Sequence, residues 1–373
     1  MDAGDFFGIG GEQDSLKSAF MVQAMDKLGY DVVTLGEREF SFGQAFLLDC
    51  LKKSKMEVVS SNLIYADTKK PFVKPYVIRK VGPIRVAIFG LIGKDSKIRT
   101  LASERALEVK DPVETAKALV PQLRKKAEVV VLLSHLGLTD GQRLTLETSG
   151  IDVMIFGHQV GLFREIVKTN GVINTRGGER GQYLPTVHLV LEDGKITSYD
   201  GEVFTLDDKV PADPEMNEMV DTFSDELNRR FSNAANAAAA PAAQAAAPAS
   251  GDRYLGEKNC RRCHESEFQL YASQKHAVAF ETLVKNQREA TPECLPCHVV
   301  GYGQVGGFMS KQGTPDLVNV QCENCHGMGT KHPEKGDPGA LVGPDVCLSC
   351  HTHEQSPNFD YDEALAHIVH WHQ

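Results

Sequence analysis

Apolar and polar positions follow different patterns in the first and last parts of the chain. Over residues 1–231, short β-branched runs alternate with amphipathic stretches that repeat at helical spacing. The expected strands are residues 31–35, 57–63, 84–91, 129–134 and 152–156, and the expected helices are residues 14–28, 43–53, 112–126 and 140–148. Strands that alternate with helices indicate an α/β layered domain.

This pattern ends at an Ala/Pro tract, SNAANAAAAPAAQAAAPASG, at residues 232–251. The tract has no large apolar residue, and Pro241 and Pro248 interrupt any helix that its alanines favour, so we expect a flexible or semi-rigid tether. A helix beginning at Pro214 precedes the tract. Its apolar residues recur at helical spacing and are expected to pack on the first domain: Met216, Val220, Phe223, Leu227 and Phe231.

Residues 252–373 have few strand runs and few large aliphatic residues, and they are rich in Gly, Pro and His. We therefore predict a second domain here, mainly helical and irregular. The predicted organisation is a domain at residues 1–231, a linker at residues 232–251 and a domain at residues 252–373.

Composition excludes some classes of function. Hydrophobic residues make up 42% of the chain and charged residues 24%, as in soluble globular proteins. No stretch approaches the roughly 20 apolar residues of a membrane helix, so no membrane span is predicted. The net charge of −10 argues against nucleic acid as a partner, because phosphate binding needs a basic surface.

Eight of the nine cysteines fall in four Cys-x-x-Cys-His motifs: CRRCH, CLPCH, CENCH and CLSCH. Two thiols at this spacing reach the two vinyl groups of one heme, and the next histidine lies under the iron. A zinc ribbon or a disulfide framework gives no reason for a histidine after every pair. We predict four heme c groups, attached at Cys260, Cys263, Cys294, Cys297, Cys322, Cys325, Cys347 and Cys350, with proximal ligands His264, His298, His326 and His351. The remaining cysteine, Cys50, is expected to be a buried small hydrophobe.

Four hemes in so short a domain must supply most of its apolar interior and lie close together, as electron hopping requires. The sixth iron ligands are not fixed by spacing alone. The candidates are His276, His332, His353, His367, His370 and His372, together with Met309 and Met328.

The second domain resembles the cytochrome c-554 family of tetraheme electron carriers. The matching stretches are YLGEKNCRRCH, SQKHAVAFETL, ECLPCHVVGYG, GGFMS, VQCENCHGMGTKH, VCLSCH and AHIVH. The resemblance implies that His276, His332 and His370 are distal ligands and that the second heme, on His298, is five-coordinate. An open iron allows small-ligand chemistry, and the spare histidines could instead close it.

Charge and chemistry suggest a partner and a location. Residues 252–373 contain 10 Lys and Arg against 16 Asp and Glu, so we expect a redox partner protein with a basic docking patch. Heme is attached to thiols outside the cytoplasm in bacteria, which predicts a periplasmic or extracellular protein. The opening MDAGDFFG carries no signal peptide. We expect that truncation has removed the signal peptide together with the first strand of the domain.

The first domain resembles the metallophosphoesterase domain of the 5′-nucleotidase family. The matching segments are DAGDFFG, LGYDVVTLGEREFSFG, SSNL, LLSHLG, IDVMIFGHQ and RGGERGQYLPTVHL. In that family two metal ions bind a phosphate and activate water. The resemblance places remnants of the metal site at Asp5, His135 and His158.

Most of the family's metal site is altered in this sequence. Val160 stands where the second histidine of the GHxH pair is expected, and Glu37-Arg38-Glu39 replaces the Asn-His-Glu triplet. We therefore expect a scaffold without hydrolase activity, which could still bind one divalent ion (Mn, Zn or Fe) through the remnants and Glu37. Two alternatives stay open: metal-dependent nucleotide hydrolysis by this domain, and redox catalysis at a five-coordinate heme.

Overall fold

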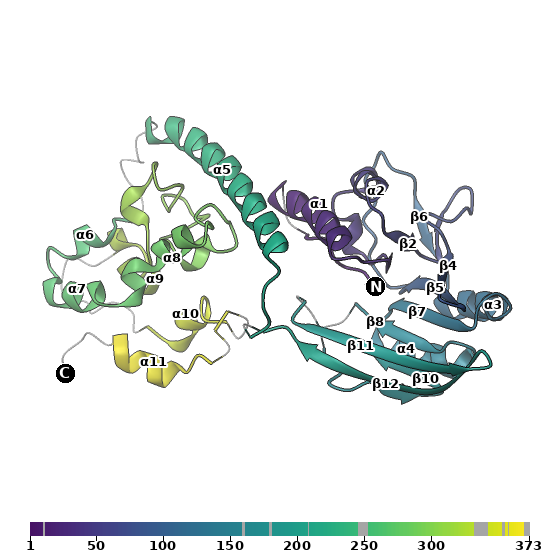
Figure 1. Cartoon of the computed structure of the whole chain (residues 1–373). Helices are drawn as coiled ribbons and strands as arrows, with labels where there is room; N and C mark the ends of the chain where they lie inside the picture. The colour runs from purple at the N-terminus through teal and green to yellow at the C-terminus, as the bar shows by residue number, and fades with distance from the viewer. Residues whose placement is uncertain are drawn as a thin grey trace. The chain divides into compact units, whose positions relative to one another are not determined.

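The computed structural model describes residues 1–9, 12–158, 161–178, 181–207, 209–244, 253–331, 342–352, 355–356 and 358–368. It divides into two compact units, Met1–Met216 and Asn217–Gln373, which are described separately below. Figure 1 shows the elements of both units.

The first unit is an α/β domain, as the sequence predicted. Its helices are α1 (Glu12–Lys27), η1 (Arg38–Phe40), α2 (Gln44–Lys52), α3 (Pro112–Arg124) and α4 (Leu138–Glu147). Its strands are β1 (Val32–Thr34), β2 (Glu57–Val59), β3 (Leu63–Tyr65), β4 (Tyr76–Val81), β5 (Ile84–Ile92), β6 (Leu107–Val109), β7 (Val129–His135), β8 (Val153–Phe156), β9 (Val167–Thr169), β10 (Val172–Thr175), β11 (Tyr183–Glu192) and β12 (Lys195–Thr205).

The main sheet has the strand order β4-β5-β7-β8-β10-β9. Strands β5, β7, β8 and β10 are parallel to their neighbours in this order, whereas β4 and β9 are antiparallel edge strands. Every residue of β7 is buried, which explains its continuous apolar run. Parallel strands place their carboxyl ends at one edge of the sheet, and this edge carries the candidate metal site.

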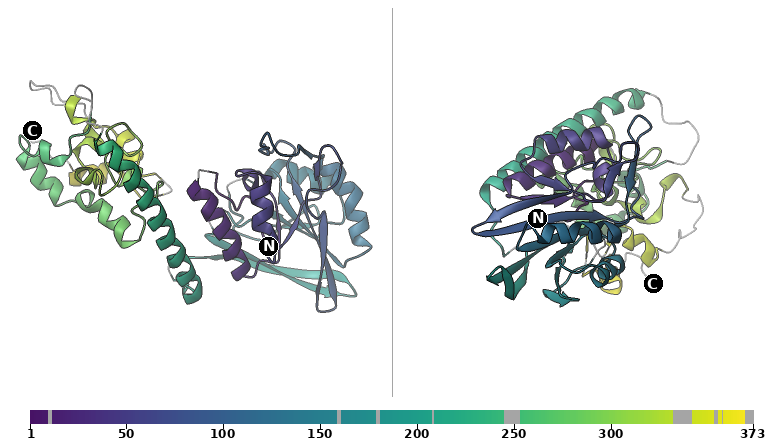
Figure 2. Two further views of the ribbon diagram at one scale, coloured as in Figure 1. Left: turned by 90° about the horizontal axis from the view of Figure 1, so that it is seen from above. Right: turned by 90° about the vertical axis from the view of Figure 1, so that its right-hand side faces the viewer.

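Both faces of the sheet are covered. Residues of α3 and α4, such as Val120 and Leu144, pack with Phe89 and Leu132 on one face of the sheet. The hairpin of β11 and β12 contributes Leu189 to the cluster on the other face. A third cluster joins α1, α2 and β1, and the two purple helices lie side by side in Figure 2.

Several strands were not expected from the apolar pattern. Residues 57–63 form two strands rather than one, because the backbone turns at Ser60–Asn62 and the Asn62 side chain binds Ile92 and Lys110. The hairpin of β11 and β12 was missed, although the Asp193-Gly194 pair at its turn is a hairpin signal. Both turn residues have positive φ angles, 49° and 73°.

The helix α5 (Pro214–Gln244) extends from the end of the first unit into the Ala/Pro tract. It continues past Pro241, where an interruption was expected, because alanine has the highest helix propensity of all residues. Residues 245–252 lie outside the described part of the chain, so the tether and the domain boundaries stay predictions. Among the described residues, no helix combines the length and apolarity of a membrane span.

The second unit is helical and irregular, as predicted. Its further elements are α6 (Glu257–Cys260), α7 (Glu265–Ala272), η2 (Lys275–Val278), α8 (Ala279–Lys285), η3 (Leu295–Cys297), η4 (Pro315–Leu317), α9 (Cys322–His326), η5 (Gly329–Lys331), α10 (Pro344–Leu348) and α11 (Tyr361–Ile368). Its described core is one small cluster that includes Phe280, Val299 and Phe308. This small protein core is what the sequence predicts for a domain filled by porphyrins.

Candidate heme-attachment sites and a candidate metal site

Four polar side chains meet at the carboxyl edge of the parallel strands in the first unit. His135 is the last residue of β7, and His158 follows β8 by two residues. Glu37 follows β1, and Asp5 follows a parallel bridge between Asp2 and Val33 of β1. One ligand atom from each of these four side chains lies within 4.8 Å of the other three.

The distances within this cluster are short. The Nε2 atom of His135 lies 3.0 Å from Glu37 Oε2 and 3.6 Å from Asp5 Oδ1. The Nδ1 atom of His158 lies 3.3 Å from Glu37 Oε1 and 3.2 Å from His135 Nε2. The structure thus brings the three predicted remnants together with Glu37.

Backbone strain and close packing hold the cluster in place. Asp5 and His158 both have a φ of 69°, which is unfavourable for residues other than glycine and is typical of functional sites. Gly36 is required by space, since a Cβ atom there would lie 2.3 Å from Asp5 Oδ1 and 2.4 Å from His135 Cε1. The absence of a side chain at Gly36 therefore lets the backbone lie directly against both ligands.

Hydrogen bonds set the protonation of the cluster. His135 Nδ1 lies 2.7 Å from the carbonyl oxygen of Ala3, so Nδ1 carries a proton and Nε2 faces Glu37. Burial alone would raise the pKa of Glu37, but hydrogen bonds with His135 and His158 outweigh burial and hold it well below its usual range. The hydrogen bond with Glu37 in turn raises the pKa of His158. A metal ion must displace these protons to bind.

Glu39 is a fully buried carboxyl that the sequence showed only as part of an altered motif. It accepts hydrogen bonds from the backbone N–H groups of Asp5 (3.0 Å), Phe7 (3.2 Å) and Gly36 (2.6 Å). Burial raises its pKa to about 7. Through these three hydrogen bonds, Glu39 connects the loops that carry Asp5 and Glu37. No signal in the sequence indicated this role, because Glu39 only appeared as a neighbour of Glu37.

The donor set fits one divalent ion. Two carboxylates and two imidazoles are the ligands that Zn²⁺, Mn²⁺ and Fe²⁺ accept. The family's second histidine would lie at Val160, outside the described residues. Arg38 lies next to the cluster. Its backbone N–H donates to Asp5 Oδ1 (2.9 Å), and the Nε atom of the Arg38 side chain lies 3.7 Å from Asp5 Oδ2.

In the second unit, the four Cys-x-x-Cys-His motifs adopt helical turns. The third motif forms α9, and in the others the backbone N–H of the second cysteine donates to the carbonyl of the first, at 3.1–3.2 Å. One helical turn places both thiols on one side of the backbone, with the histidine next to them. This geometry suits attachment of one porphyrin to each turn.

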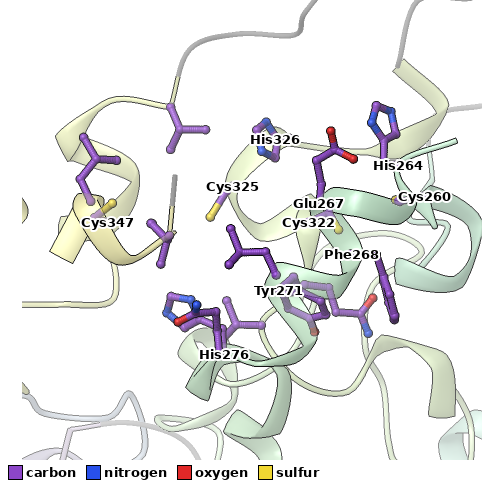
Figure 3. A pocket seen from close by; sticks show the side chains of 17 residues that line it. Cys260, His264, Glu267, Phe268, Tyr271, His276, Cys322, Cys325, His326 and Cys347 are labelled. Carbon is purple, nitrogen blue, oxygen red and sulfur yellow. The ribbon is translucent and has the colours of Figure 1, made fainter. Parts of the chain in front are cut away.

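Three of the motifs share a pocket of about 910 Å³, part of it open to solvent. Figure 3 shows that Cys260, Cys322, Cys325, Cys347 and His276 gather around it. Its other walls include aromatic and aliphatic side chains: Phe268, Leu270, Tyr271, Val320, Val342, Leu365 and Ile368. A mainly apolar pocket with histidines at its margin fits a flat aromatic cofactor.

The predicted distal ligand His276 faces a proximal histidine. The ring centroids of His276 and His351 lie 6.1 Å apart. His351 also stacks on Phe359 at 4.3 Å, which holds its ring.

Some of the other predicted heme ligands lie within the described residues, and others lie outside them. His298 Nδ1 lies 2.7 Å from the carbonyl oxygen of Ala279, which leaves Nε2 for a metal. His264 and His326 line the shared pocket. His332 and His370 lie outside the described residues, as do the spare candidates His353 and His372.

Thiols of different motifs also lie close together. The Cys260 and Cys322 thiols lie close enough to affect each other's pKa, and the Cys350 thiol lies close enough to Cys297 to add to the effect of burial in raising the pKa of Cys297. The first motif is thus next to the third, and the second is next to the fourth. No disulfide joins any of the nine cysteines.

Comparison with known proteins supports both halves of this description. Residues 259–327 match the family described as cytochrome c554 and c-prime. Cytochrome c-554 of Nitrosomonas europaea is 34% identical over 91 residues, covering 20% of this chain and 39% of the relative.

The chain is also similar to nucleotide phosphoesterases. The 2′,3′-cyclic-nucleotide 2′-phosphodiesterase/3′-nucleotidase of Haemophilus influenzae is 29% identical over 187 residues, 44% of this chain. The structure of a 5′-nucleotidase precursor from Thermus thermophilus is similar with a TM-score of 0.54 and 26% identity, covering 61% of this chain and 49% of that one.

The chain spans only part of these relatives, 28% of the length of the Haemophilus influenzae protein. Its sheet, its strand-end cluster and its cysteine motifs agree with the two resemblances. The chain therefore joins an N-terminal domain of the 5′-nucleotidase-like metallophosphoesterase fold to a C-terminal region that matches the cytochrome c554 family.

Proposed function

We propose that this protein is an exported electron carrier that moves electrons through four covalently attached hemes. The observation that carries this proposal is the pocket shared by three Cys-x-x-Cys-His motifs, with His276 facing His351 across 6.1 Å. The match of residues 259–327 to a cytochrome family supports heme c as the cofactor.

Heme iron supplies one-electron redox chemistry. The residues of the chain hold and orient it. The cysteine pairs would anchor the porphyrin, and the histidines that follow them would be ligands of the iron. We propose that His276, whose ring centroid lies 6.1 Å from that of His351, would bind the iron of the fourth motif from the other side, and that His332 and His370 would be ligands as the resemblance implies.

The positions of the thiols group the four proposed heme-attachment motifs into two neighbouring pairs. Cys260 lies against Cys322, and Cys297 lies against Cys350. Neighbouring thiols would hold the two porphyrins of each pair close together, and this would favour electron exchange within the pair. Cys325 and Cys347 line the same pocket, which connects the pairs.

Heme content and redox activity test this proposal. A purified exported chain is expected to contain four hemes by pyridine hemochrome assay and iron analysis, and to take up four electrons in a potentiometric titration. Zinc in place of iron, or fewer than four reducible hemes in a fully matured chain, would overturn it.

For the first unit we propose a scaffold that holds one divalent ion through Asp5, Glu37, His135 and His158. The 4.8 Å cluster supports one ion, and Arg38 beside Asp5 places a positive charge where a second metal would otherwise be attracted. Elemental analysis should give one metal per chain besides iron.

The same cluster favours a second candidate function, hydrolysis of phosphoesters. A metal-bound water is the nucleophile that such a site offers. Assays with nucleotides and cyclic nucleotides in Mn²⁺ or Zn²⁺ separate the two candidates. Turnover that Glu37→Gln abolishes would replace the scaffold proposal with a bifunctional protein.

Redox catalysis at an open second heme is the third candidate. His298 has its Nδ1 atom held by Ala279, which supports iron binding from one side. Binding of CO to the reduced protein, seen in its absorption spectrum, would favour a catalytic site over simple electron transfer.

A further inference from the structure

The third motif carries polar side chains that bind the other motifs. Glu323 and Asn324 are the two residues between its cysteines, and Gln321 precedes it. Gln321 and Glu323 are buried, with 3% and 4% of their surface exposed. Buried polar side chains of this kind need partners, and each of them finds these partners in another segment.

Glu323 receives three backbone N–H groups. Leu255 donates to both of its carboxylate oxygens (2.9 Å each), Gly256 donates to Oε2 (2.8 Å) and Gly329 donates to Oε1 (2.6 Å). Leu255 and Gly256 lead into α6, which ends at Cys260 of the first motif. Glu323 therefore fixes the first motif to the third.

The neighbouring side chains add to this connection. Gln321 Oε1 accepts the N–H of Glu257 in α6 (2.7 Å), and its amide group donates to the carbonyls of Asp316 and Val318. Asn324 Nδ2 donates to the carbonyl of Val299, the residue after His298 (3.0 Å). The third motif thus contacts both the first and the second.

The charge of Glu323 is not neutralised by the described side chains. Its partners are N–H donors only, which suits an ionised carboxylate, and no described Lys or Arg forms an ion pair with it. The negative charge of Glu323 acts on the predicted heme-attachment cysteine Cys260. The pKa of the Cys260 thiol is raised by the neighbouring Cys322 thiol, then by burial, and then by the negative charges of Cys322 and Glu323.

We propose that Glu323 is a positioning residue that fixes the first and third hemes relative to each other and lowers their reduction potentials. This proposal rests on the proposed electron-carrier function. The three N–H hydrogen bonds set the spacing of the two motifs. The carboxylate stabilises the more positive ferric state of both hemes, so it makes them harder to reduce.

Glu323→Gln is the primary test, because it removes the charge and keeps the size of the side chain. Glu281, an exposed glutamate of the same domain, provides the matched control as Glu281→Gln. Glu323→Asp keeps the charge but shortens the reach to Leu255, Gly256 and Gly329. The three variants and the unaltered protein are compared by heme content, by potentiometric titration and by electron paramagnetic resonance of coupled hemes.

Glu323→Gln is expected to shift two of the four reduction steps to higher potential, by about tenfold in the reduction equilibrium, or about 59 mV for one electron. Glu281→Gln should leave all four steps unchanged. Glu323→Asp should keep the potentials and alter the magnetic coupling of two hemes. Unchanged potentials in a Glu323→Gln protein with four hemes would overturn the proposal.

If the Glu323→Gln protein loses hemes, the magnetic coupling of the hemes in Glu323→Asp becomes the test of the positioning role. Coupling in Glu323→Asp identical to that of the unaltered protein then contradicts the positioning role. A protein without hemes even before substitution would instead refute the electron-carrier function, so the two failures are distinguishable.

Discussion

Glu37 and His135 lie 3.0 Å apart at the carboxyl edge of the sheet, with His158 3.3 Å from the same carboxylate. A glutamate at this position gives the cluster a second carboxylate beside Asp5. The cluster therefore has the charge to hold a divalent ion by itself.

We expect Glu37→Gln to weaken binding of Mn²⁺ or Zn²⁺ by at least tenfold, or about 1.4 kcal/mol. The substitution removes a charged ligand and leaves the shape of the side chain. Isothermal titration of the metal-depleted protein measures the effect. Glu192→Gln, at an exposed position of β11, is the control and should bind as the unaltered protein does.

Gly36→Ala should abolish metal binding while the chain stays folded. The added Cβ atom would lie 2.3 Å from Asp5 Oδ1, so the ligands must move apart. Gly343→Ala is the control, since no heavy atom lies within 4 Å of the added atom. Elemental analysis measures the metal content and circular dichroism measures the folding of both variants. Metal retained by Gly36→Ala would count against the assigned site.

The raised pKa of Glu39 predicts a pH dependence of stability. Between about 4.5 and about 7 the unfolded chain has lost this proton while the folded chain keeps it. The contribution of Glu39 to stability therefore falls as pH rises through this window. Thermal unfolding of the EDTA-treated protein should show this decline.

Glu39→Gln removes the titrating group and should flatten that part of the profile. The two proteins are compared through the difference between their melting temperatures at each pH. A difference in melting temperature that stays constant from pH 4.5 to pH 7 would show that Glu39 is ionised throughout.

His276→Ala should open one iron to external ligands. We expect an added high-spin heme and CO binding in the reduced state, because His276 faces His351 at 6.1 Å. His367→Ala, at an exposed histidine of the same domain, should leave the spectrum unchanged. The opposite pattern would make His367 the ligand in place of His276.

The acidic balance of residues 252–373 predicts salt-sensitive electron exchange with a basic partner. The second-order rate with a basic cytochrome should fall as ionic strength rises from low to physiological values. A rate that is independent of salt would exclude electrostatic steering from the mechanism.

The layered fold could be predicted because buried parallel strands such as β7 are continuous apolar runs. The edge strands β4 and β9 and the hairpin of β11 and β12 were not predicted, since partly buried or exposed strands carry mixed residues. Tertiary packing, which the sequence pattern does not display, decides these elements.

The candidate sites divide in the same way. The motif spacing predicted the heme attachments, which stay predictions, and the resemblance pointed to Asp5, His135 and His158, which the structure brings together. The roles of Glu39 and Glu323 were not predicted, because each acts through backbone N–H groups of distant segments: Asp5 lies 34 residues from Glu39, and Leu255 lies 68 residues from Glu323. Only a folded chain brings such partners together.

The proximity of the Cys260 and Cys322 thiols has a consequence for biogenesis. A chain that folds in an oxidising compartment before its cofactors are joined holds two thiols from different motifs in contact, where a disulfide is the competing product. We therefore expect assembly to run from the N-terminal motif onward, with each cysteine pair kept reduced until its thioethers form. Alkylation mapping of the cofactor-free chain would detect the trapped cross-link, and its absence would show that attachment is not limited by this competition.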